Sequence, residues 1–158
     1  VEEYEFAIDT DDGFDVDEAG PGSLIAMIAG SQILDNLDEG LDYDEEGPGG
    51  IDLTVVDSRA TGNTDDGFKN SEEDEGGVTC RVSGAVSTAN GGKGIVCEEE
   101  DAGDVMVLVS ATTTGNNDDS DETGLEIVPD DAGTGALIVV GSEIADGIDA
   151  EGVDVSEM

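Results

Sequence analysis

Residues 78–110 read VTCRVSGAVSTANGGKGIVCEEEDAGDVMVLVS, and this stretch indicates the fold class. Residues 78–86 place Val, Cys, Val, Gly and Val at every second position, which is the period of a β-strand. Residues 90–92 (Asn-Gly-Gly) tolerate positive φ and therefore favour a turn, after which residues 94–97 resume a strand. Residues 104–110 are apolar at nearly every position, which predicts a strand buried on both faces. The stretch therefore predicts short strands joined by glycine-rich turns.

Other parts of the chain repeat this alternation of apolar runs and turns. We expect further strands at Glu3–Ile8, Ser23–Ala29, Ile51–Val56, Leu125–Val128 and Ala136–Val140. Gln32–Leu41 spaces its Ile and Leu residues at helical intervals, which predicts a short amphipathic helix or a turn. Arg59–Gly77 is polar and charged and predicts a long loop. No exact internal repeat is visible.

The number of short strands, roughly seven to nine, predicts an all-β protein. We expect a small β-sandwich or a partly open β-barrel with long acidic loops and at most one short helix. One β domain over residues 1–158 is the simplest organisation, with a flexible N-terminal arm at 1–22 and a C-terminal tail at 142–158. Two small lobes that divide near residues 47–50 are the alternative.

The strongly negative charge of the chain excludes some classes of binding partner. Its 158 residues include 42 Asp and Glu against 4 Lys and Arg, with no His, so the formal net charge is −38. Nucleic-acid binding and anionic membrane surfaces require a basic footprint, and transmembrane helices require about 18–20 apolar residues in a row. We therefore expect no direct nucleic-acid partner and no membrane partner.

Two interpretations account for so many carboxylates. The first is a disordered acidic chain, and the second is a folded protein adapted to concentrated salt. At about 0.15 M salt the screening length is about 8 Å, and neighbouring surface charges still repel, whereas at about 1 M it is about 3 Å. The strand-like runs and the 36% hydrophobic content favour a folded, halophilic protein.

Cys80 and Cys97 lie on two expected strands. A four-residue turn at Ser87–Asn90 would place them opposite each other, and a disulfide there would stabilise the fold by about 3 kcal/mol. Both residues also fit apolar patterns in which a free cysteine is an ordinary buried side chain. Disulfide and buried thiols both stay open, although an intracellular location favours thiols. Two cysteines without His do not complete a zinc site.

One acidic loop has the ligand spacing of a calcium loop over half its length. Asp119, Asp121 and Thr123 offer oxygens at the first, third and fifth positions, and Gly124 is sixth. The pattern then departs, because Asp130 stands where a bidentate Glu is expected. In a chain this acidic such matches arise by chance, so we expect diffuse K⁺ or Na⁺ solvation, no specific divalent cation and no cofactor.

The residues favour no catalytic chemistry. Paired carboxylates occur throughout the chain, so pairing identifies no acid and base. Ser and Thr lack a His partner, and no Gly-rich phosphate loop or dinucleotide motif occurs. We therefore expect a protein that is not an enzyme.

The order Gly94–Cys97, Glu98–Ala102, Gly103–Val109 resembles capsid cement and head-decoration proteins of tailed viruses. Gly20–Met27 is similar to the Pro-Gly and apolar strand that open the barrel in such families. The resemblance implies a β-barrel or sandwich that sits on an icosahedral shell, often as a trimer, and bridges major capsid subunits. Together with the charge it implies a virus of a haloarchaeon and a location in the virion. The sequence departs from the pattern at Ser110–Ala111, where a Gly is expected.

The N-terminal segment offers one apolar face at Val1, Tyr4, Phe6 and Ile8. In the decoration hypothesis this segment adds a strand to a partner, either the major capsid protein or another copy of the chain. The alternative is that it forms the first strand of its own sheet. Two other functions stay open: a cell-surface or secreted β-domain of a halophile, and an acidic mimic of nucleic acid.

Overall fold

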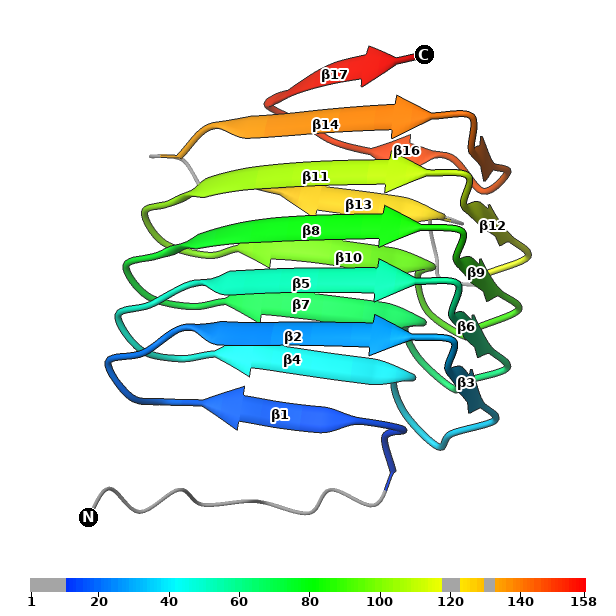
Figure 1. Ribbon diagram of the computed structural model, residues 1–158, viewed down its shortest axis with the longest axis horizontal. Helices are drawn as coiled ribbons and strands as arrows, with labels where there is room; N and C mark the ends of the chain where they lie inside the picture. The colour runs from blue at the N-terminus through cyan, green and yellow to red at the C-terminus, as the bar shows by residue number, and fades with distance from the viewer. Residues whose placement is uncertain (1–10, 118–122, 130–132) are drawn as a thin grey trace.

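The chain forms a parallel β-solenoid of about five turns, not a sandwich or a barrel (Figure 1). This computed structural model describes residues 11–117, 123–129 and 133–158. Every regular element in these residues is a β-strand. The prediction of an all-β chain is confirmed, and the prediction of a β-sandwich or partly open β-barrel is wrong.

Each turn contributes a strand to each of three parallel sheets. Sheet A contains β1 (Asp15–Glu18), β4 (Leu41–Glu45), β7 (Phe68–Glu72), β10 (Ile95–Glu99), β13 (Leu125–Val128) and β16 (Ile148–Asp149). Sheet B contains β2 (Leu24–Ala29), β5 (Ile51–Val56), β8 (Gly77–Ser83), β11 (Asp104–Ser110), β14 (Gly135–Val140) and β17 (Val153–Glu157). Sheet C contains the short strands β3 (Gln32–Leu34), β6 (Arg59–Thr61), β9 (Val86–Thr88), β12 (Thr113–Gly115) and β15 (Glu143–Ile144).

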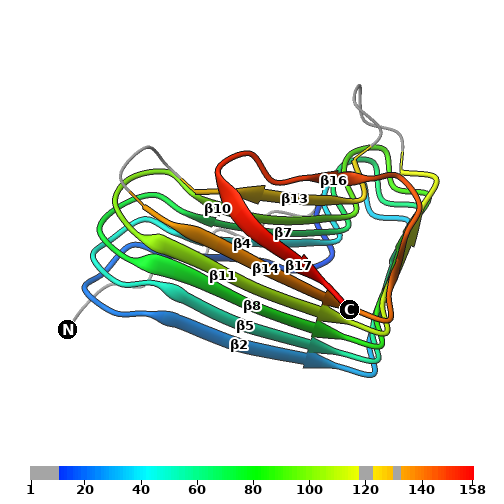
Figure 2. The ribbon, with the colours of Figure 1, turned by 90° about the horizontal axis from the view of Figure 1, so that it is seen from above.

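Strand pairing explains why the sandwich prediction fails. Strands that follow one another in sequence do not form hairpins, and each strand pairs in parallel with its counterpart one turn later. Val78 of β8 pairs with Val105 of β11, whereas the expected hairpin would have paired β8 with β10. A two-residue period is common to both architectures, so alternation alone does not distinguish them. Figure 2 shows sheets A and B along opposite sides of the solenoid.

Two segments differ from their predicted structure. The expected helix or turn at Gln32–Leu41 begins as strand β3 and ends where β4 starts, and Ile33 and Leu41 both point into the core. The expected loop at Arg59–Gly77 contains β6 and β7, so this polar stretch is most of a solenoid turn. Residues 15–18 of the proposed arm form β1, and the proposed tail contains β15, β16 and β17.

The core consists of columns of like residues stacked from turn to turn. In sheet A, Leu41, Phe68, Ile95 and Leu125 occupy one inward column and are fully buried. Sheet B faces them with Ile51, Val78 and Val105 in a second inward column. Because each apolar side chain covers the next, these columns remove apolar surface from water along the whole axis.

The corner between sheets B and C requires a left-handed residue in every turn. Gly30, Asp57, Gly84, Ala111 and Gly141 occupy this corner with φ values of 60°, 47°, 64°, 48° and 53°. Left-handed backbone costs an alanine about 1–2 kcal/mol, whereas glycine adopts it freely. Ala111, which stands where the sequence pattern led us to expect Gly, therefore strains its turn.

An asparagine ladder runs along the corner between sheets C and A. Asn63 donates from Nδ2 to Oδ1 of Asn90 at 3.0 Å, and Asn90 donates in the same way to Asn117 at 3.0 Å. The backbone N–H of each residue donates to the same oxygen of the next turn. The ladder continues to Asn36 on one side and Asp146 on the other. It satisfies polar groups that the loops would otherwise bury unpaired.

Glycine is needed beside this ladder because the turns approach closely. A Cβ on Gly67 would lie 2.6 Å from the carbonyl oxygen of Gly94 and 2.7 Å from Nδ2 of Asn90, and it would also collide with Oγ of Ser87. Any larger residue at Gly67 therefore pushes neighbouring turns apart.

Asn90→Ala should destabilise the chain by about 2–4 kcal/mol, because Asn63 loses its acceptor and Asn117 loses its donors inside the protein. The measurement is urea unfolding followed by far-ultraviolet circular dichroism in about 1 M KCl, where surface repulsion is screened. Gln32→Ala, at an exposed position of β3, is the matched control and should change stability by less than about 0.5 kcal/mol. Equal stability of the two variants would contradict the ladder's role.

Ala111→Gly should stabilise the chain by about 0.5–1 kcal/mol, because glycine removes the left-handed strain at this corner. Ala85→Gly serves as the control, since Ala85 is buried and does not have a positive φ. This second change should destabilise the chain through lost packing and a more flexible unfolded state. The same urea titration reports both variants, and loss of stability in Ala111→Gly would refute the assignment of strain.

Candidate functional site

The outer face of sheet A collects carboxylates from successive turns. Asp42 and Asp44 alternate outward on β4, while Glu98 and Glu126 do so on later turns. Lys69 on β7 lies among them, with its Nζ 3.1 Å from Asp42 and 3.9 Å from Asp44. The only other lysine, Lys93, places its Nζ 2.6 Å from Oε1 of Glu126. Both lysines therefore neutralise part of an otherwise acidic face.

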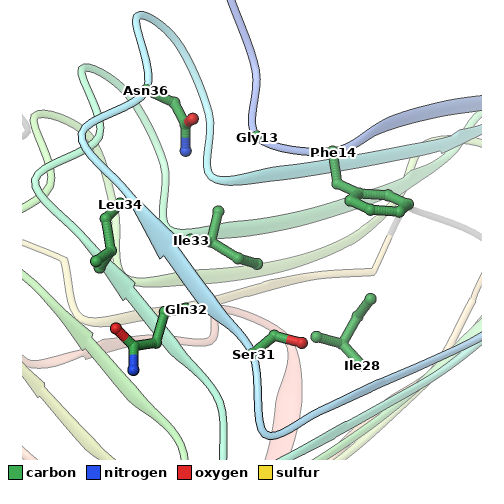
Figure 3. A pocket seen from close by; sticks show the side chains of 8 residues that line it. All are labelled: Gly13, Phe14, Ile28, Ser31, Gln32, Ile33, Leu34 and Asn36. Atoms are coloured by element: carbon green, nitrogen blue, oxygen red, sulfur yellow. The ribbon is translucent and has the colours of Figure 1, made fainter.

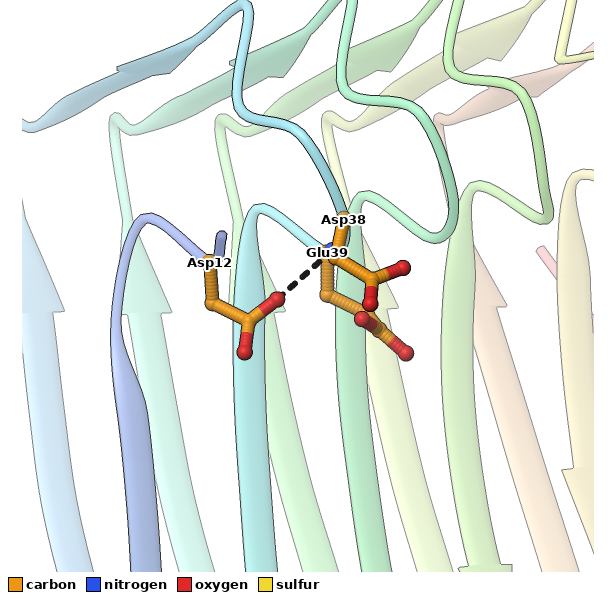
Figure 4. A group of neighbouring side chains, drawn as sticks. All are labelled: Asp12, Asp38 and Glu39. Carbon is orange, nitrogen blue, oxygen red and sulfur yellow. Dashed lines mark hydrogen bonds between the residues drawn. The ribbon is translucent and has the colours of Figure 1, made fainter. Parts of the chain in front are cut away.

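A tighter group of acids lies at the first turns of the corner between sheets C and A (Figure 4). Carboxylate oxygens of Asp12, Asp38 and Glu39 lie within 4.8 Å of one another. The backbone N–H of Glu39 donates to Oδ1 of Asp12 at 2.9 Å. Asp38 is exposed, whereas the other two side chains are partly buried.

Burial and mutual repulsion raise the pKa of several of these acids. Burial, followed by repulsion from Asp42, raises the pKa of Glu39 to about 8. The same two causes raise the pKa of Asp44 to about 7, although Lys69 opposes them. Burial and the nearby Asp17 raise the pKa of Asp15 to about 6. Glu39 therefore retains its proton at neutral pH, whereas Asp44 and Asp15 titrate near and just below neutral pH.

The group formed by Asp12, Asp38 and Glu39 offers oxygen ligands of the kind that hard cations prefer. Carboxylates gather wherever a surface is this acidic, and Asp38 is open to water. The arrangement therefore identifies an acidic patch that attracts counter-ions, without selecting one ion.

The residues singled out in the sequence are only partly described. Val1, Tyr4, Phe6, Ile8, Asp119 and Asp121 lie outside the described residues. Thr123, the remaining candidate of the calcium-like loop, is buried. The structure therefore does not test the N-terminal partner segment or the calcium-like loop.

Cys80 and Cys97 are buried free thiols on β8 and β10, in two different sheets. Burial and the neighbouring Cys80 raise the pKa of the Cys97 thiol well above its usual value. A thiol that resists ionisation is a poor nucleophile and a poor metal ligand. These residues therefore act as core side chains in this structure.

Sequence reasoning missed the outer face of sheet B. Ile25, Met27 and Met106 point outward and are 79%, 67% and 60% exposed. Leu108 and Ile138 continue this apolar face along the next strands. The prediction that residues 104–110 are buried on both faces is therefore wrong, because only alternate residues of β11 enter the core. The sequence did indicate this face, since a strand with apolar residues at nearly every position has an apolar outer face as well as an apolar inner face.

Charged side chains are few on this outer face. On the outer face of the described strands of sheet B they are Asp52, Arg81, Asp104 and Asp154, whereas Glu157 of β17 is in register with the inward Val139. Arg81 forms an ion pair with Asp52 on the neighbouring strand. Sheet B thus presents a weakly charged face, in contrast to the acidic outer face of sheet A.

A hollow of about 460 Å³ opens at the first turn of the described solenoid (Figure 3). Phe14, Ile28 and Ile33 line it together with polar residues of β3 and its flanks. Phe14 and Ile33 belong to columns that are buried in later turns, as at Phe68 and Ala60. The hollow is therefore the open end of the core columns.

Comparison of the chain with protein families, curated proteins and solved structures gives no match. Among the described residues there is also no helix with the length and apolar character needed to cross a membrane.

The chain should be more stable near pH 5 than near pH 8.5. In the folded state the pKa of Glu39 is about 8, above its ordinary value of 4.5, so between these values the folded chain holds a proton that the unfolded chain has lost. Stability is therefore lost as the pH rises towards 8. Thermal unfolding in about 1 M KCl should show a lower midpoint at the higher pH.

Glu39→Gln should reduce this pH dependence, because Gln does not titrate. Glu143→Gln, at an exposed position of β15, is the matched control and should leave the dependence unchanged. A midpoint that rises between about pH 5 and about pH 8.5 would show that the buried acids do not dominate the linkage.

Proposed function

We propose that the chain is a non-enzymatic structural module that associates with a second copy of itself through the outer face of sheet B. The observation that carries this proposal is the exposed apolar surface of Ile25, Met27, Met106 and Leu108 on a face with few charges. Exposed apolar surface of this kind is typical of an interaction site.

Electrostatic repulsion between two copies determines which faces can meet. Each copy has a formal net charge of −38, so contact through the acidic face of sheet A would place carboxylates against carboxylates. Contact through sheet B brings together Ile, Met, Leu and Thr side chains, and the Asp52–Arg81 pair adds no net charge. Repulsion between copies is therefore weaker at sheet B than at sheet A.

The size of the face indicates a weak association. Six strands about 4.8 Å apart, each with about six residues of 3.3 Å rise, give a flat area of roughly 500 Å². A standard interface buries about 800 Å² on each partner. We therefore expect association at high protein concentration, and only where concentrated salt screens the remaining surface.

A structural role is consistent with the prediction that the chain is not an enzyme. The absence of enzymatic activity itself remains a prediction. The resemblance behind the capsid-decoration hypothesis implied a β-barrel or sandwich, and the chain does not have that architecture. Attachment to a major capsid protein, and location in a virion or at a cell surface, also remain predictions. A stiff solenoid with one adhesive face suits each of these locations.

The proposal predicts reversible dimers in about 1 M KCl, measured by sedimentation velocity over a series of protein concentrations. Met106→Asp should raise the dissociation constant at least about tenfold, because it places a charge in the apolar face. Leu37→Asp adds the same charge at a residue that is 71% exposed on a loop outside sheet B, and it should leave association unchanged.

Two results would refute the sheet B interface. One is a wild-type chain that stays monomeric at every concentration in high salt. The other is equal association of the wild type and Met106→Asp, which would show that copies meet through another surface.

A further inference from the structure

A column of glutamates lies inside the solenoid, at the ends of the sheet A strands. Glu18, Glu45, Glu72 and Glu99 are in register, and each pairs with the next across β1, β4, β7 and β10. On β4, β7 and β10 the glutamate occupies the last inward position of the strand. Acidic side chains of this glutamate column therefore stack on one another from turn to turn.

Each buried glutamate has one oxygen with a partner and one without. The side chains of Glu45, Glu72 and Glu99 are 0% exposed. Their Oε1 atoms accept backbone N–H groups two residues later, at 3.1 Å from Gly47, 3.2 Å from Asp74 and 3.1 Å from Asp101. Their Oε2 atoms receive no hydrogen bond from an amide or hydroxyl group of the described residues. A buried oxygen needs a donor, and here the donor must come from another source.

The neighbouring glutamates are that source. The side chain of Glu45 forms hydrogen bonds with the side chains of Glu18 and Glu72. Two ionised carboxylates offer acceptors alone, so a hydrogen bond between two glutamates requires a proton on one of them. An O–H···O⁻ bond of this kind is short and about twice as strong as a bond between neutral groups.

Backbone packs tightly over the same carboxyl groups. A Cβ on Gly76 would lie 2.7 Å from Oε1 of Glu72 and would collide with the carbonyl oxygen of Gly49. A Cβ on Gly49 would lie 3.1 Å from Cδ of Glu45 and would collide with the carbonyl oxygen of Gly22. Because the carboxyls are fully buried beneath this backbone, a proton, which needs no additional volume, suits the column as its positive charge.

The basic residues of the chain pair elsewhere or lie exposed. Lys69 and Lys93 pair with acids on the outer face of sheet A, and Arg81 pairs with Asp52 on sheet B. Arg59 is exposed on β6. Since an uncompensated buried charge is strongly destabilising, the column needs protons.

The other groups that face the column bring no positive charge. The adjacent inward row of sheet A consists of Tyr43, Asn70, Cys97 and Ile127. Burial raises the pKa of Tyr43 and of Cys97, so both are uncharged at neutral pH. Strand β8, which packs against β7 and β10, presents the buried side chains of Val78 and Cys80. The residues that follow the buried glutamates are themselves acids, at Glu46, Glu73 and Glu100.

We infer that protons shared between Glu18, Glu45 and Glu72 hold the first turns of the solenoid together, and that alkaline pH releases this contact. A shared proton joins β1 to β4 or β4 to β7, whereas two carboxylates at the same places repel each other. The column is therefore a pH-sensitive contact inside the fold, and it does not depend on the sheet B interface.

The titration of the column has a definite sign. Burial raises the pKa of Glu72 to about 8, and the hydrogen bond with Glu45 and the charges of Glu45 and Glu99 act in the same direction. Burial also raises the pKa of Glu45. The ordinary value is 4.5, so this contribution to stability is fully present below pH 4.5 and is lost as the pH rises through about 8.

Glu72→Gln tests the inference, because an amide of nearly the same shape donates and accepts at every pH. The wild-type thermal unfolding midpoint in about 1 M KCl should fall by about 5 °C or more between about pH 6 and about pH 9. In Glu72→Gln this fall should be clearly smaller, because the site no longer ionises. Contributions of other acids, such as Glu39, are common to both chains and cancel in the comparison.

Two further variants separate the proton from packing and from surface charge. Glu46→Gln removes the same charge at the exposed neighbour of Glu45, and it should keep the whole pH-dependent fall. Glu72→Ala removes the donor together with the packing, and it should lower the midpoint already at about pH 6, where Glu72→Gln stays close to the wild type.

Infrared spectroscopy detects the protons directly, since protonated carboxyls and carboxylates absorb at different frequencies. The folded wild type at neutral pH should show a band of protonated carboxyl groups, which decreases in Glu72→Gln and persists in Glu46→Gln. If Glu72→Gln fails to fold, Glu45→Gln carries the same two measurements, because Glu45 shares both hydrogen bonds of the column.

Two results would overturn the inference. One is a variant, Glu72→Gln, whose midpoint falls as far as that of the wild type between the two pH values. The other is a protonated-carboxyl band that has the same intensity in the wild type and in Glu72→Gln, which would place the retained protons outside the column.

Discussion

Stacking in register is the constraint on which the whole structure depends. Each turn lies one strand spacing above the last, so every side chain contacts its own counterpart from the neighbouring turn. A column is stable only if its residue type tolerates contact with itself. Leucine, isoleucine and phenylalanine do so by excluding water, and asparagine does so because its amide donates and accepts at once. Glutamate does so only when it can hold a proton, and burial raises the pKa of Glu72, which is stacked between Glu45 and Glu99, to about 8.

The sequence predicted strands well and their arrangement poorly, for an identifiable reason. Alternation at residues 78–86 and 104–110 depends on local order, and β8 and β11 lie there. Parallel pairing over 27 residues is not local. The sequence signal for this pairing is an inexact repeat, in which stacked residues such as Phe68 and Ile95 are both apolar but are not the same residue type. The asparagines at 36, 63, 90 and 117 repeat without change, and a search at that period would have favoured a solenoid.

For the candidate surfaces, too, the sequence composition predicted the total charge but not where the charges lie on the fold. Composition indicated strong repulsion and a need for screening, but not that the acids gather on sheet A and the turn loops while sheet B stays nearly neutral. That segregation follows from which residues alternate outward on each sheet, as Asp42 does on β4 and Met106 on β11. Alternation assigns inward and outward residues only once the strand register is known.

The short strands of the last turn have a mechanical consequence. β15 and β16 contain two residues each, whereas β8 and β11 contain seven. Because each turn contacts only its immediate neighbours, rupture of one turn removes a single layer and leaves those behind it intact. Under tension the solenoid therefore unfolds one turn at a time, with weak resistance where its strands are as short as β15 and β16, whereas a globular domain unfolds in a single step.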